Sequence, residues 1–116
     1  MQARSLVAIA LGSLIAASWI TNALAAEKLP KLPKDTEYSE ARRSLLALDW
    51  APVKLPDADT CQDGDDRCNG RPEMLACVGT GQANCVFTWK RGDTLIEVMT
   101  IGEMPVVSGV RCRAGC

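Results

Sequence analysis

The chain has 116 residues, which is enough for one domain at most. Its formal net charge of −1 gives no positive field that would attract nucleic acid or an anionic membrane surface. It contains no histidine, and this excludes the commonest general base, the usual serine and cysteine triads and most catalytic zinc sites.

Residues 1–25 have the pattern of a signal peptide. Arg4 supplies a positive charge, residues 6–20 form an apolar run, and Ala23-Leu24-Ala25 has the small residues of a cleavage site. We predict cleavage after Ala25 and no stable membrane insertion afterwards. The alternative is an uncleaved membrane anchor, because residues 6–26 are about long enough to cross a bilayer. Four polar residues within this stretch argue against an anchor: Ser13, Ser18, Thr21 and Asn22.

The cysteines indicate an oxidising compartment. One of the 13 basic residues is Arg4, so cleavage leaves 12 basic and 14 acidic side chains and a net charge of −2. The remaining chain has few aromatic side chains for a core, and small exported domains commonly compensate with disulfides. We therefore predict a periplasmic or secreted protein in which all six cysteines are paired: Cys61, Cys68, Cys77, Cys85, Cys112 and Cys116.

The exported chain is expected to begin with an extended segment. Residues 26–35 carry Pro30 and Pro33 between lysines, a composition typical of a solvated lead-in with polyproline character. Residues 36–116 then form a single small domain.

An amphipathic helix is predicted over residues 37–48. Asp35 or Thr36 can cap its start, and Arg42 and Arg43 are expected on its solvated side. A left-handed Asp49 followed by a contact from Trp50 back to the helix would end it, and Pro52 prevents continuation. The spacing of the apolar residues predicts which side chains form the buried face: Tyr38, Ala41, Leu45 and Leu48.

An acidic segment follows, with five aspartates between residues 57 and 66. Calcium takes several carboxylate oxygens at once, so a calcium loop has to be considered. The spacing does not fit, because Cys61 takes the third position of such a loop and Gly70 stands where a bidentate glutamate belongs. We predict an acidic surface turn closed by Cys61 and Cys68, without a metal.

The second half of the chain predicts a sheet. Residues 85–90 alternate with period two, residues 94–101 return as a hairpin, and a turn at 102–105 leads to a strand at 106–112. Together with the helix this gives an α+β fold, with the helix packed on a three-stranded antiparallel meander. The sheet has four strands if residues 53–55 also pair. Residues 74–78 fit a short helix or a strand.

The predicted meander constrains the disulfides. A middle strand separates Cys85 from Cys112 by about 9 to 10 Å. A disulfide bridges at most about 7 Å between Cα atoms. The preferred pairing is therefore sequential: Cys61 with Cys68, Cys77 with Cys85, and Cys112 with Cys116.

Few residues offer catalytic chemistry. There is no Cys-x-x-Cys motif, and the cysteine spacings do not form a zinc knuckle, so we predict no metal and no cofactor. Glu73, Glu97 and Glu103 remain as an acid and base for a small hydrolase, although scattered acids are usually surface residues.

Two motifs carry a resemblance: Arg71-Pro72-Glu73-Met74 leading to Cys77, and Cys85-x-Phe87-x-Trp89. They resemble a family of small cysteine-containing secreted or periplasmic proteobacterial proteins to which no function is assigned, so the resemblance implies no site residues. The order of helix and strands is similar, in architecture only, to modules of β-lactamase inhibitory proteins and of outer-membrane assembly lipoproteins. This chain lacks the lipid-attachment cysteine of the lipoproteins.

These observations favour an exported, non-catalytic binding or structural module whose partner is another envelope or extracellular protein. A secreted enzyme inhibitor and the carboxylate hydrolase are the alternatives. Aromatic and arginine side chains dominate interface energetics, so the binding candidates are Trp50, Trp89 and Arg91. The alternation of Trp89 with Phe87 also fits a core position.

Overall fold

A computed structural model describes residue 12 and residues 29–116. The predicted signal peptide and the start of the lead-in therefore lie outside the described residues, apart from residue 12. Within the described part of the chain, no helix has the length and hydropathy needed to cross a membrane.

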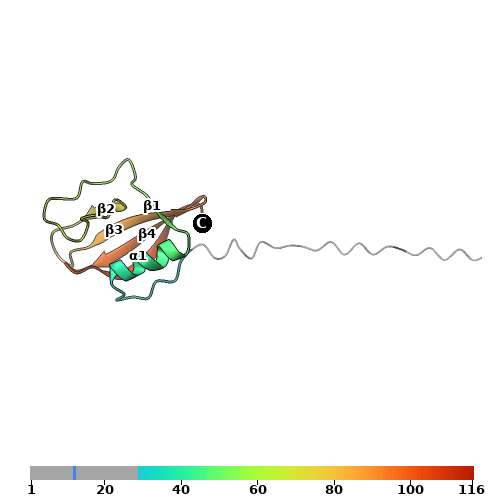
Figure 1. The fold of residues 1–116 in the computed structure, drawn as a ribbon, viewed down its shortest axis with the longest axis horizontal. Coiled ribbons are helices and arrows are strands. Elements are labelled where there is room, and N and C mark those ends of the chain that lie inside the picture. The colour runs from blue at the N-terminus through green and yellow to red at the C-terminus, as the bar shows by residue number, and fades with distance from the viewer. Residues whose placement is uncertain (1–11, 13–28) are drawn as a thin grey trace, which may run out of the picture.

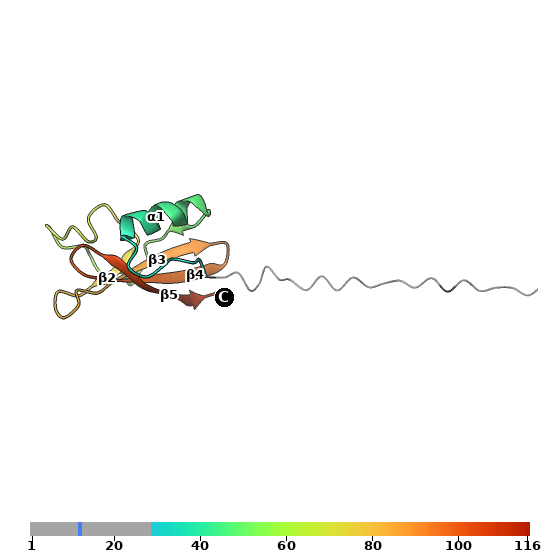
Figure 2. The same cartoon turned by 90° about the horizontal axis from the view of Figure 1, so that it is seen from below.

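The fold has two layers, one helix and one antiparallel sheet. Helix α1 (Tyr38–Ala47) lies across one face of the sheet, as Figures 1 and 2 show from two directions. The five strands are β1 (Ala51–Pro52), β2 (Met74–Cys77), β3 (Cys85–Arg91), β4 (Thr94–Ile101) and β5 (Val106–Ala114). Their order is β1-β3-β4-β5, and β2 also pairs with β3. The predicted meander is present as β3, β4 and β5, and the sheet is larger than predicted by two short strands.

The two short strands share one edge of β3. β1 pairs at Trp89 and Lys90, whereas β2 pairs along residues 85–87. Between them, the Thr88 N–H donates to the Glu73 carbonyl at 2.8 Å and its hydroxyl donates to the Val53 carbonyl at 2.8 Å. The prediction of a first strand at residues 53–55 is therefore wrong in position, because the strand lies at Ala51–Pro52. The sequence of residues 74–78 fits either a helix or a strand, and in the structure residues 74–77 form a strand.

Helix α1 ends as predicted and begins differently. Asp49 has a φ of 65°, and the Trp50 N–H donates to the Leu45 carbonyl at 3.0 Å, which closes the last turn. At the start, the N-cap residue is Glu37 and makes no side-chain cap, so the predicted cap by Asp35 or Thr36 is wrong. The Tyr38 N–H donates instead to the Pro105 carbonyl at 2.9 Å, so the turn before β5 satisfies this end of the helix.

The core lies between the helix and the sheet. Tyr38, Ala41 and Leu45 are fully buried, as predicted, but Leu48 is 51% exposed. The helix ends before Leu48, and the left-handed turn at Asp49 brings Trp50 into the core in its place. The sheet side of the core is formed mainly by side chains of β3, β4 and β5: Cys85, Phe87, Trp89, Ile96, Val98 and Val107.

The described part of the lead-in is attached to the domain. Leu32 packs against the core, and the Asp35 N–H donates to the Val107 carbonyl at 2.8 Å. The segment is therefore not fully solvated, which corrects the prediction for residues 29–35. Its backbone covers the outer edge of the first part of β5, an edge that would otherwise be open to pairing with another chain.

The sheet face opposite the helix has a polar part and an apolar part. Glu97 is 6% exposed and accepts hydrogen bonds from Arg111 at 2.8 Å and Arg113 at 3.4 Å. Met99 reaches over Gly109, where an added Cβ would lie 3.1 Å from the Met99 Cε. Among the described elements, no helix covers this face.

Candidate functional site

One buried polar network joins the helix to the sheet. Glu73 is completely buried and accepts hydrogen bonds from the Arg42 Nε at 2.5 Å and the Tyr38 hydroxyl at 2.9 Å. The Trp89 Nε1 donates to the Tyr38 oxygen at 3.0 Å. Arg42 therefore does not lie on the solvated side of the helix, as the sequence suggests, but turns inward because Glu73 offers its carboxylate there.

The electrostatics of this network act on Tyr38 and Arg42. Burial and the neighbouring Glu73 raise the pKa of Tyr38 far above its ordinary value, so the hydroxyl stays protonated and donates. The hydrogen bond to Glu73 raises the pKa of Arg42. Glu73, Tyr38 and Trp89 are buried and paired with one another or with the partly exposed Arg42, and this network orients α1 on the sheet.

The three binding candidates lie together but do not form an exposed surface. Trp50 is 2% exposed and Trp89 is completely buried, so neither indole is exposed, as the prediction of binding residues required. Trp89 is held inward by its bond to Tyr38. The Arg91 guanidinium lies 4.6 Å from the centre of the Trp50 ring and donates to the Leu48 carbonyl at 3.2 Å, so it covers the indole.

The three carboxylates considered for a hydrolase do not come together. Glu73 points toward the helix, Glu97 lies on the opposite face of the sheet, and Glu103 belongs to the turn between β4 and β5. The sheet separates the first two.

A second network joins loops at one end of the domain. The disulfides pair Cys61 with Cys68, Cys77 with Cys85, and Cys112 with Cys116, which is the sequential set that the meander favours. The first closes the acidic turn, and the second ties β2 to β3 across the loop 79–84. No cysteine is left free.

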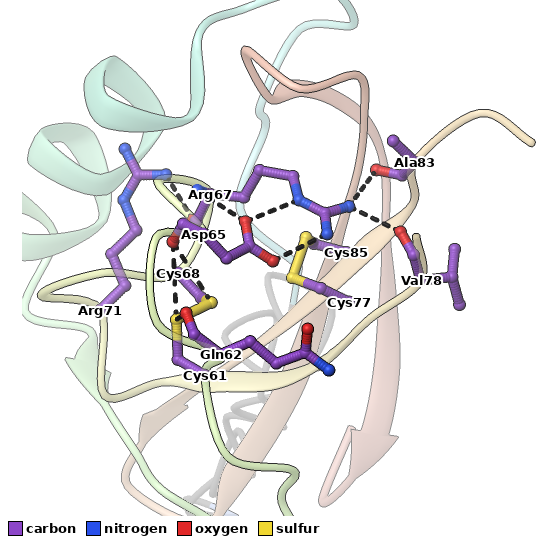
Figure 3. A network of polar contacts seen from close by, with 10 residues as sticks. All are labelled: Cys61, Gln62, Asp65, Arg67, Cys68, Arg71, Cys77, Val78, Ala83 and Cys85. Atoms are coloured by element: carbon purple, nitrogen blue, oxygen red, sulfur yellow. Dashed lines mark hydrogen bonds and ion pairs between the residues drawn. A yellow bond between two sulfur atoms is a disulfide. The ribbon is translucent and has the colours of Figure 1, made fainter. Parts of the chain in front are cut away.

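Arg67 connects these two closed loops, as Figure 3 shows. Its guanidinium donates to both carboxylate oxygens of Asp65, at 2.9 and 2.8 Å. It also donates to the carbonyls of Val78 at 2.7 Å and Ala83 at 3.2 Å, on either side of the β2–β3 connection. One side chain from the acidic turn therefore holds the neighbouring loop by its backbone.

A third segment is tied to the same end. The Gly102 N–H donates to the Gln82 carbonyl at 2.8 Å, so the turn before β5 is fixed to the loop 79–84. We call residues 61–68, 79–84 and 102–105 the stapled loop end. Two disulfides, Arg67 and this backbone bond fix its shape before any ligand binds.

The stapled loop end encloses an open hollow of about 550 Å³. The carboxylates of Asp63, Asp66 and Glu103 line it, and Glu103 interacts electrostatically with Arg67. Met104 stands at its margin with 81% of its surface exposed, more than any other large hydrophobic side chain in the described part of the chain. The complete lining is Gln62, Asp63, Gly64, Asp65, Asp66, Arg67, Gly79, Ala83, Glu103 and Met104.

The sulfur atoms near this hollow are unsuited to hold a metal in the oxidised protein. The ligand atoms of Asp65, Cys68 and Cys77 lie within 4.8 Å of one another. Both sulfurs belong to disulfides, and metal ligation requires the thiolate. The Asp65 carboxylate is also occupied by Arg67.

The Arg67–Asp65 pair predicts a loss of stability in acid. Hydrogen bonds from Arg67 hold the pKa of Asp65 below its ordinary value of about 4, so the pair contributes fully above that pH. This contribution disappears as the pH falls through the lowered pKa. Chemical denaturation between pH 5 and pH 2 should show a shallower loss of stability for Asp65→Asn than for the wild type. Asp63→Asn, which removes a carboxylate without a partner, should keep the wild-type profile; equal profiles for all three proteins would contradict the assignment.

The two disulfides of this end were predicted from the sequence, but the other residues that shape it were not. Arg67 is one of two arginines near the acidic turn, and the sequence does not distinguish them. Its acceptors at Val78 and Ala83 are backbone carbonyls, which every residue has, so the residue types do not reveal the contact. Met104 has a recognisable signal, an isolated apolar residue between Glu103 and Pro105 in a turn. No protein-family model, curated protein or solved structure matches the chain.

Proposed function

We propose that the protein is an exported, non-catalytic binding module whose stapled loop end binds a positively charged segment of another exported protein. The observation that carries the proposal is the Arg67 clamp, which joins two disulfide-closed loops around an open hollow. A surface fixed in advance loses little conformational entropy on binding.

The compartment follows from the disulfides. Three disulfides with no free cysteine indicate an oxidising environment such as the periplasm or the extracellular medium. The proposal adds that residues 1–25 act as a cleaved signal peptide and deliver the domain there. The partner would then be a protein of the same compartment.

The chemistry of the hollow determines the kind of partner. Asp63, Asp66 and Glu103 contribute three negative charges to the hollow, while Arg67 is bound to Asp65 and two carbonyls and also attracts Glu103 electrostatically. The hollow therefore presents net negative charge, which attracts lysine or arginine side chains and repels acidic segments. Met104 provides an exposed apolar contact beside these charges, and flexible methionine side chains adapt to varied partners.

Binding of two synthetic peptides tests this function. An alternating lysine–leucine peptide should bind the wild-type protein in fluorescence anisotropy, and an alternating glutamate–leucine peptide of equal length should not. The triple variant Asp63→Asn/Asp66→Asn/Glu103→Gln should weaken the affinity for the basic peptide about tenfold, since each rim charge contributes a fraction of 1 kcal/mol. Added salt should reduce the difference between the proteins.

The matched control is Glu40→Gln, which removes an exposed carboxylate from α1 that does not line the hollow. It should bind like the wild type. Equal binding of both peptides, or equal affinities for the triple variant and the wild type, would refute the proposed surface.

A further inference from the structure

The three disulfides differ sharply in their access to solvent. Cys68 is 2% exposed and Cys85 is 1% exposed, and each belongs to a separate disulfide. Those two disulfides lie against one another, because the sulfurs of Cys68 and Cys77 are within 4.8 Å. In the third disulfide, both Cys112 and Cys116 are exposed.

We infer that the disulfide between Cys112 and Cys116 is a thiol-exchange site, which small thiols open reversibly while the other two disulfides and the fold remain intact. Thiol–disulfide exchange requires a thiolate to reach one sulfur along the direction of the S–S bond. Both sulfurs of this bridge are open to such an approach. At the other two bridges, a buried sulfur and the packed neighbouring disulfide obstruct it unless the loops open.

The exchange reaction needs two equivalents of the small thiol and no metal or cofactor. The thiolate of a small thiol attacks the Cys116 sulfur and forms a mixed disulfide, while the Cys112 sulfur leaves as a thiolate and takes a proton from water. A second small thiol then attacks the reagent sulfur of the mixed disulfide. This releases Cys116 as a thiol and the oxidised form of the small thiol; attack at Cys112 gives the same products.

Opening the bridge affects a defined contact. The ring closed by this disulfide contains Gly115, which has a φ of 73° and lies so close to the β3–β4 turn that an added Cβ would be 1.9 Å from the Asp93 carbonyl oxygen. The Thr94 hydroxyl donates to the Gly115 carbonyl at 3.2 Å. Exchange would release Gly115 from this turn.

The rest of β5 does not depend on the bridge. β5 remains paired with β4 through Ile96 opposite Cys112 and Glu97 opposite Arg111, and Glu97 binds Arg111 and Arg113 on the far face. The exchange therefore switches the end of the strand between a held and a released state without unfolding the sheet.

Time-resolved trapping tests the inference. Native protein is incubated with reduced glutathione, quenched with iodoacetamide at intervals and mapped by peptide mass spectrometry. We expect glutathione or alkyl adducts on Cys112 and Cys116 to appear at least about tenfold faster than on the other four cysteines, because those need a local opening first. The circular dichroism spectrum should stay native during this first phase.

The variant Cys112→Ser/Cys116→Ser supplies the control and should lose the fast phase. The wild-type labelling decides the question even if this variant folds poorly. The inference is overturned if another pair reacts first, if all six cysteines react together, or if the native spectrum is lost during the first phase.

Discussion

Replacement of Glu73 by alanine should lower the free energy of unfolding by about 3 kcal/mol, as is typical when one partner of a buried ion pair is removed. The variant leaves the Arg42 guanidinium and the Tyr38 hydroxyl without their acceptor inside the core. Arg42 is partly exposed, so water compensates part of the loss. Urea denaturation followed by circular dichroism measures the change.

Two further measurements show whether the loss of stability comes from the pair of Glu73 and Arg42. Glu40→Ala removes an exposed carboxylate from the same helix and should change stability by no more than about 0.5 kcal/mol. A double-mutant cycle with Arg42→Ala should give a coupling energy of about 1 to 3 kcal/mol between Arg42 and Glu73. A loss below about 1 kcal/mol for Glu73→Ala would show that the network does not hold the helix on the sheet.

Removal of the disulfide between Cys77 and Cys85 should cost about 3 kcal/mol, and removal of the one between Cys112 and Cys116 about 2 kcal/mol or less. The first closes the longer loop, with a sequence separation of 8 compared with 4. It also contributes the buried sulfur of Cys85 to the core, so the variant Cys77→Ala/Cys85→Ala loses packing as well.

The two double alanine variants serve as each other's control, because each removes one disulfide of the same chain. Thermal and urea denaturation should place the Cys112→Ala/Cys116→Ala protein closer to the wild type. The reverse order would mean that the exposed ring, and not the loop end, stabilises the domain.

Local sequence signals predicted the parts of the fold that depend on neighbouring residues. The end of α1 is determined by Asp49, Trp50 and Pro52, three consecutive or nearly consecutive residues whose backbone preferences act directly. β3 has enough residues for period two to be visible, and β4 was predicted as its hairpin partner from β-branched and apolar residues after a turn. The sequential disulfides followed from the strand order.

The contacts that could not be predicted join residues far apart in the chain. Glu73 lies 31 residues from Arg42, so no helical or strand periodicity connects them. β2 has only four residues, too few to distinguish a strand from a helical turn. Trp50 was a candidate for binding because aromatic side chains dominate interface energetics. In the structure it is buried, and Arg91, a residue much later in the chain, covers its ring.

The burial of Trp50 could not be read from the sequence for the same reason. Composition favoured tryptophan and arginine as contact residues, but both tryptophans are needed for the small core. The surface proposed for binding is instead built from loops held by Arg67 and from the carboxylates that line the hollow. Such a surface is visible only once the loops are in place.

Backbone amide NMR of the isotope-labelled protein titrated with the lysine–leucine peptide tests the central claim most directly. The account predicts shift changes concentrated at the stapled loop end, at Gly64, Asp66, Gly79, Glu103 and Met104. Changes centred instead on Val86 and Met99 of the open sheet face, or no change at any residue, would contradict it.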